Sequence, residues 1–137
     1  YGRATEYHAE DGWSQKVPIV VVVNERSASA SEIFAGVLQD YGYQVVGTKT
    51  FGKGIVQSLY TLSDQSAVKF TTDQYMLPDG ALIHGAGIEP DVAVEFEDSE
   101  ELTSRMVNYA GGREAKLEGD AQIETAVRLI QDAIQAE

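Results

Sequence analysis

Residues 19–40 read IVVVVNERSASASEIFAGVLQD, and this stretch decides the fold. Its β-branched start predicts a strand buried on both faces of a largely parallel sheet. Small hydroxyl residues follow, and a helical period begins at Ser29 and is stopped by Gly42. The predicted apolar face of that helix consists of Ile33, Phe34, Val37, Leu38 and Tyr41. A strand, a turn with serines and a helix together can hold a nucleophilic hydroxyl at the N-terminus of the helix.

Downstream of this stretch the sequence is rich in strand signals. A short second strand is predicted at 45–46, and two longer strands at 55–62 and 67–76 flank the turn 63–66. In the second of these, Val68 and Phe70 alternate with polar residues, which predicts one buried and one exposed face. The overall interpretation is an α/β fold.

The C-terminal part predicts a last strand and two helices. Val92, Val94 and Phe96 alternate as a strand, and a helix is predicted from Asp98 to the glycine pair at 111–112. The final helix is predicted after Asp120, a favourable N-cap. Its expected apolar stripe is Ile123, Val127, Ile130 and Ile134.

Composition limits the class of protein. The chain has 137 residues, 43% of them apolar, and no cysteine, so one compact domain without disulfides is expected. A net charge of −12 disfavours nucleic acid and anionic membrane surfaces as partners. The longest apolar run, PIVVVV, is too short to cross a bilayer. Since the chain does not begin with Met, we interpret it as a segment of a longer protein.

The serines at 27, 29 and 31 become nucleophiles only if a base accepts a hydroxyl proton. Histidine is the usual base, but His8 lies in a weakly patterned lead-in and His84 beside a glycine-rich turn. Lysine is the alternative, provided that burial or a neighbouring cation keeps it neutral. Lys53 is placed for this, between two glycines and next to Phe51. No metal constellation and no cofactor are expected.

Simpler interpretations remain open for both segments. Ser29 and Glu32 have the S-x-x-E spacing of a capping box and could serve only to start the helix. The glycines around Lys53 could form a phosphate-binding or merely exposed loop, although the Walker spacing is missing.

Four segments in order resemble the carboxyl-terminal processing (tail-specific) serine proteases, peptidase family S41. Residues 24–40 resemble the family's SASASE nucleophile segment, and residues 50–57, TFGKGIVQ, resemble its TFGKG-x-x-Q lysine loop. Residues 70–80, FTTDQYMLPDG, and 87–91, GIEPD, resemble two further motifs of the family. The resemblance covers roughly residues 18 to 135.

The resemblance implies specific roles for individual residues. Ser29 corresponds to the nucleophile, Lys53 to the general base and Gln57 to the residue that orients the lysine amine, while Glu32 is a weaker candidate for the site. The implied reaction is peptide hydrolysis through an acyl-enzyme by a Ser-Lys dyad. We expect the Ser29 N–H to be one oxyanion donor, since it lies at the positive end of the helix.

The resemblance also implies an architecture and a setting. The fold would be a ClpP/crotonase-like core of ββα units, and residues 1–137 would be the C-terminal part of the catalytic domain. A second oxyanion donor, a PDZ domain and upstream core segments would then lie outside this chain, so the chain alone should be weak or inactive. The family implies protein or peptide substrates bound by their C-terminal tails. It also implies an extracytoplasmic location, in the periplasm or cell envelope, with a membrane anchor possible in the full-length protein.

Two alternatives from other classes are retained. The same core resembles the repeats of retinoid-carrying proteins, which would make the chain a non-catalytic ligand-binding module, although the joint presence of Ser29, Lys53 and Gln57 argues against this. The chain could also be a purely structural fragment. Substrate identity and oligomeric state do not follow from the sequence.

Overall fold

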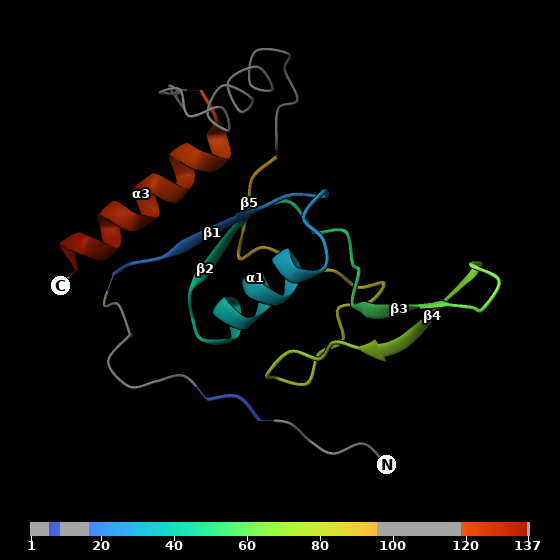
Figure 1. The fold of residues 1–137 in the computed structure, drawn as a ribbon. Helices are drawn as coiled ribbons and strands as arrows, with labels where there is room; N and C mark the ends of the chain where they lie inside the picture. Colours follow the sequence, from blue (N-terminus) through green and yellow to red (C-terminus); the bar gives the residue numbers. More distant parts are fainter. Residues whose placement is uncertain (1–5, 9–16, 96–118, 137) are drawn as a thin grey trace.

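The computed structural model describes residues 6–8, 17–95 and 119–136. Its centre is a parallel sheet in the order β1-β2-β5 (Figure 1), formed by β1 (Val20–Val23), β2 (Gln44–Gly47) and β5 (Val92–Ala93). Val21 pairs with Val45, and Val46 pairs with Val92. The prediction of a largely parallel sheet behind a β-branched strand is therefore confirmed.

Two helices pack on this sheet from different sides. Helix α1 (Ala30–Asp40) places Ala35 against Val23 and Val45, with Val21 beside them. Because successive strand residues face opposite ways, the other face is left for α3 (Ala121–Gln135), which contacts β1 and β2 (Figure 1). The predicted N-cap is confirmed, since the Asp120 carboxylate accepts from the N–H groups of residues 122 and 123.

The predicted apolar faces of both helices are only partly right. In α1, Phe34 is 61% exposed and Tyr41 is 73% exposed, whereas Glu32, Ala35 and Gly36 are buried. A glycine there lets Leu77 come close, because a Cβ on Gly36 would lie 2.7 Å from its side chain. Small residues thus form the contact face, and the bulkier ones are displaced to its border. In α3, Val127 and Ile134 are likewise exposed.

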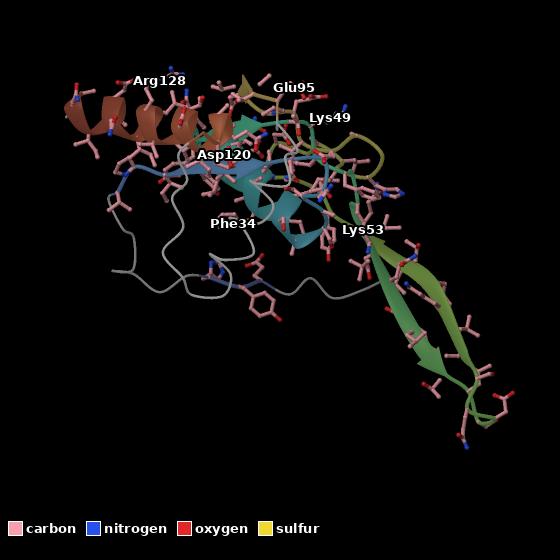
Figure 2. All side chains as sticks on the ribbon, turned by 90° about the horizontal axis from the view of Figure 1, so that it is seen from above. Phe34, Lys49, Lys53, Glu95, Asp120 and Arg128 are labelled. Carbon is pink, nitrogen blue, oxygen red and sulfur yellow. The ribbon has the colours of Figure 1, made fainter. Side chains whose placement is uncertain are left out.

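Strands β3 (Ile55–Thr61) and β4 (Ala67–Gln74) form an antiparallel hairpin that projects away from the sheet and helices (Figure 2). Both strands and the turn were predicted correctly. The expectation of a buried face on β4 was wrong, since all eight of its residues are exposed. Period-2 alternation reports two distinct faces, but it does not require a neighbouring layer that covers one of them. The faces do differ, because Tyr60 and Phe70 stack on one of them with ring centroids 5.0 Å apart.

After the hairpin, residues 76–91 form a loop that returns to α1. Leu77, Ile83 and Ile88 are its buried residues and form a second apolar cluster with partly buried residues of the helix. Asp91 then accepts hydrogen bonds from the Val45 N–H at 2.8 Å and from the Gln39 side chain at 3.0 Å. The loop is therefore fixed both to the helix and to the sheet.

The predicted α/β class is confirmed. The helix expected between residues 98 and 110, and Phe96, lie outside the described residues. Within the described part of the chain, no helix has the length and apolar character needed to cross a membrane. The same ranges contain no group of three or more His, Cys, Asp or Glu residues suited to a metal ion.

Candidate functional site

Ser29 occupies the sharp turn between β1 and α1. Its φ of 59° and ψ of −116° are unusual for a residue with a side chain. Such strained conformations are kept where the surrounding structure holds them, often at functional sites. The turn is fixed by the Asn24 side chain, which accepts from the Arg26 N–H, and by the Ser27 hydroxyl, which accepts from the Asn24 N–H.

The lysine loop lies beside this turn although it is distant in sequence. The Thr48 N–H donates to the Val23 carbonyl at 3.2 Å, and the Phe51 N–H donates to the Ser27 carbonyl at 3.0 Å. On its other side the loop meets the 83–88 segment. A Cβ on Gly54 would lie 2.4 Å from the backbone nitrogen of His84, so only glycine fits there. The two glycines of Gly-Lys-Gly thus serve close backbone packing.

Glu32 connects the serine turn to the lysine loop. Its side chain is completely buried, and its Oε2 accepts from the N–H groups of Ser29 and Lys53, each at 2.8 Å. Its Oε1 accepts from the Gly52 N–H at 2.6 Å and from the Thr50 hydroxyl at 2.5 Å. The predicted capping box with Ser29 is present. Glu32 does more than start the helix, because its carboxylate is the buried link between the two segments.

The protonation state of Glu32 follows from this environment. Burial alone would raise the pKa of the carboxyl group, because a charged group loses its hydration. The bonds from Thr50, Lys53, Gly52 and Ser29 act in the opposite direction and together lower the pKa below its usual value. Four donors that all favour the charged form outweigh the desolvation, so Glu32 is a carboxylate at neutral pH.

Ser29, Lys53 and Gln57 line one cleft of about 280 Å³, near the point where the hairpin leaves the core (Figure 2). The remaining residues that line the cleft are Ile55, Val56, Lys69 and Tyr75. The structure thus brings together the three residues expected from the resemblance. Glu32 lies directly behind them and contacts two of them through the backbone. Lys69 and Tyr75 were not identified from the sequence.

Two features of the cleft differ from the expected arrangement. Lys53 is exposed and its neighbour Phe51 is 68% exposed, so the described residues do not bury the lysine. A second lysine, Lys69, lines the same cleft. Gln57 follows a β-bulge between residues 56 and 57, a feature that redirects side chains. Among the described residues, no hydrogen bond joins Gln57 to the lysine amine.

The expected oxyanion donor is wrong. The Ser29 N–H is occupied, since it donates to Glu32 at 2.8 Å. The following N–H, that of Ala30, begins helix α1 and donates to no acceptor within the described ranges. The helix N-terminus still presents a free donor beside the serine, one residue further along the chain. The S-x-x-E spacing could have predicted this, because in a capping box the glutamate accepts a hydrogen bond from the N–H of the serine.

The histidines do not take part in this arrangement. His84 is exposed, and it is its backbone that packs against the lysine loop. His8 contacts Glu6 at 3.5 Å, and both side chains are at least 80% exposed. Neither residue lines the cleft.

Comparison with known proteins places this arrangement in a family. A protein of Staphylococcus epidermidis named "Probable CtpA-like serine protease" is 49% identical over 82 residues, which are 59% of this chain and 17% of that protein. The chain thus spans 17% of the length of this curated relative. The photosystem II D1 C-terminal processing protease superposes with a TM-score of 0.56 at 43% identity, over 58% of this chain and 21% of that protein.

A more distant structure agrees in fold alone. Mature CPAF in complex with lactacystin matches 86% of this chain and 20% of its own, with a TM-score of 0.55 at 23% identity. The model of peptidase family S41 matches residues 1–94, which include the serine turn, the lysine loop and the hairpin. The α/β core described above is therefore that of the S41 proteases, and the chain belongs to peptidase family S41.

Proposed function

We propose that this chain carries the nucleophile and the general base of a serine endopeptidase that cleaves protein substrates near their C-termini. The observation that supports this most directly is that Ser29 and Lys53 line one cleft, while a single buried carboxylate binds the backbone N–H of both. A fixed distance between nucleophile and base is the main requirement of a dyad. The printed names of the relatives describe serine and C-terminal processing proteases.

The reaction begins with proton transfer from the Ser29 hydroxyl to the neutral amine of Lys53. The serine oxygen attacks the peptide carbonyl carbon, and the carbonyl π bond becomes the lone pair of an oxyanion. The Ala30 N–H is a suitable donor to that oxyanion because it has no acceptor among the described residues and lies at the positive end of α1. Lys53 then protonates the departing amine as the C–N bond breaks, which leaves the acyl-enzyme. Water, deprotonated by the same lysine, hydrolyses the ester and restores the serine.

Gln57 completes the proposed set as the residue that orients the lysine amine. The bulge beside it and its position on the cleft support this role. Cleavage near C-terminal tails, a PDZ domain elsewhere in the protein and an extracytoplasmic location belong to the same proposal. The first of these is supported by a relative whose name describes C-terminal processing. The PDZ domain and the location are proposed from the resemblance of the motifs to the family.

The test is peptide hydrolysis by the chain and by a longer form of the protein, each compared with its Ser29→Ala and Lys53→Ala variants. We expect the longer form to lose activity by at least about a thousandfold with either substitution. The chain alone should be weak or inactive, since one N–H makes only part of an oxyanion hole. A longer Ser29→Ala protein that keeps its activity would refute the nucleophile. An isolated chain with full activity would refute the claim of incompleteness.

A fluorophosphonate probe separates this proposal from a ligand-binding module of the same fold. Such a probe reacts with an activated serine and should label Ser29 in the longer form. Labelling should be lost in the Lys53→Ala variant, because the base is missing. The Ser31→Ala variant, which changes an exposed serine at the start of α1, should label normally. A longer form that resists the probe but binds small apolar ligands would favour the binding module.

A further inference from the structure

The wall of the cleft opposite the serine turn is one face of the β3–β4 hairpin. Gln57 pairs with Thr71, and Leu59 pairs with Lys69, so these four residues share a face. Tyr60 and Phe70 stack on the opposite face. Lys69 is therefore two residues beyond the position opposite Gln57, on the side of the hairpin that faces Ser29, and it lines the same cleft.

The charge of this cleft contrasts with that of the chain. Among the described residues, its lining contains two lysines and no acidic side chain, whereas the chain as a whole carries a net charge of −12. Glu32 lies behind the cleft, but both of its oxygens are already bound by donors of the two segments. Within residues 17–95 and 119–136 no carboxylate forms an ion pair with Lys69. The ion pair of Lys49 with Glu89, at 2.6 Å, lies outside the cleft.

We propose that Lys69 is a specificity-determining residue that binds a carboxylate of the peptide substrate. The proposal rests on the proposed function and names the substrate class for that site, a peptide with an acidic group a few residues from the scissile bond. An ammonium on a flexible four-carbon stem can follow such a group without fixed geometry. In a strongly acidic domain, the ammonium of Lys69 also attracts acidic peptides that the rest of the surface repels. The carboxylate is either an Asp or Glu side chain or the α-carboxylate of the chain end.

Peptide binding to the Ser29→Ala variant of the longer form tests the proposal without cleavage of the peptide. The probes are labelled eight-residue peptides that carry one glutamate at each position in turn, matched peptides with glutamine, and both sets with a free or an amidated C-terminus. The best glutamate peptide or the free-acid peptide should bind about fivefold more tightly than its neutral partner, the size of a favourable exposed ion pair. If replacing glutamate by glutamine weakens binding, Lys69 binds a side-chain carboxylate. If amidation of the C-terminus weakens binding, Lys69 binds the α-carboxylate of the peptide.

Lys69→Met should abolish this preference, and Lys69→Glu should reverse it in favour of lysine peptides. Lys49→Met is the matched control, because it removes the same charge from the chain but from a residue outside the cleft. Lys69 is exposed on an exposed strand, so its variants should fold, as circular dichroism would verify. A preference that survives Lys69→Met, an equal loss in Lys49→Met, or no difference between acidic and neutral peptides would overturn the proposal.

The outcome is separable from that of the proposed function. Hydrolysis by the longer form that depends on Ser29, without any acidic preference, would retain the peptidase and reject Lys69. An acidic preference that depends on Lys69, in a protein that does not hydrolyse any of these peptides, would retain the binding site and count against the peptidase.

Discussion

Substitution of Glu32 by glutamine should destabilise the fold strongly, although it changes only one atom. The carboxylate accepts four hydrogen bonds, two on each oxygen, from a position that is 0% exposed. Glutamine has one oxygen and one NH₂ group, so the two donors that bound the replaced oxygen now face the NH₂ group, which is itself a donor. The better orientation keeps the oxygen towards Ser29 and Lys53 and turns the NH₂ group towards Thr50 and Gly52.

The free-energy cost can be worked out from this orientation. The Thr50 hydroxyl can rotate and accept from the new NH₂ group, but the Gly52 N–H has no such freedom and is left unpaired. One unpaired buried N–H costs about 1–3 kcal/mol, and the two remaining bonds lose their charge-assisted strength, about 1 kcal/mol each. The sum is about 3–5 kcal/mol, a large part of the 5–15 kcal/mol by which domains are typically stable.

The assay is urea unfolding at neutral pH, followed by circular dichroism, with the free energy obtained by linear extrapolation. Glu25→Gln is the matched control, since Glu25 lies in the same turn but is exposed. It makes two weak contacts, a hydrogen bond from the Thr48 hydroxyl at 3.3 Å and an exposed ion pair with Arg26 at 3.7 Å. We expect the control to change stability by less than about 0.5 kcal/mol. A Glu32→Gln protein as stable as the control would refute the idea that this carboxylate holds the two segments together.

Three further predictions concern pH, a close approach and a helix cap. Because the pKa of Glu32 is lowered in the folded state, its contribution to stability is complete above the usual value of 4.5 and is lost as the pH falls below that value. The difference in the free energy of unfolding between wild type and Glu32→Gln should therefore shrink when unfolding is measured at increasingly acid pH. Gly54→Ala should cost about 2–3 kcal/mol, measured by urea unfolding, since its Cβ would lie 2.4 Å from the His84 nitrogen. Asp120→Ala should lower the thermal unfolding midpoint through the loss of about 1 kcal/mol from the N-cap of α3.

Each of these has its own control. Asp64 also has a lowered pKa, through the hydroxyl and N–H of Ser66, but it is fully exposed in the hairpin turn, so Asp64→Asn should leave the acid dependence nearly unchanged. Gly80 has a positive φ and open space around it, so Gly80→Ala should cost only about 1 kcal/mol. Asp132→Ala, on the same helix as the cap, should leave the midpoint unchanged. Equal effects in a variant and its control would contradict the corresponding argument.

Local signals in the sequence predicted the elements well. A run of β-branched residues, a change of period at Ser29 and a favourable cap at Asp120 each depend on neighbours in the chain, and each was confirmed. Burial was predicted less well, because it depends on what packs against an element. Phe34 and Val68 are exposed although their spacing is that of buried residues, since no described segment covers them.

The site shows the same division. The residues around the cleft were anticipated because their motifs resemble those of a family, whereas Lys69 lies on β4 and is brought to Ser29 only by the pairing of the hairpin. The S-x-x-E spacing correctly indicated a cap for Ser29. It did not reveal the three other donors to Glu32, which come from a loop about twenty residues further along the chain.

The hydrogen bonds of Glu32 also bear on how this part of the protein can be engineered. Because the carboxylate of Glu32 binds both the serine turn and the lysine loop, the backbone shape of each segment depends on that of the other. If residues 24–40 of a relative replaced those of this chain without residues 48–57 of the same relative, the grafted glutamate would meet N–H and hydroxyl donors positioned for a different carboxylate. Recombination libraries should therefore place no crossover between the two loops.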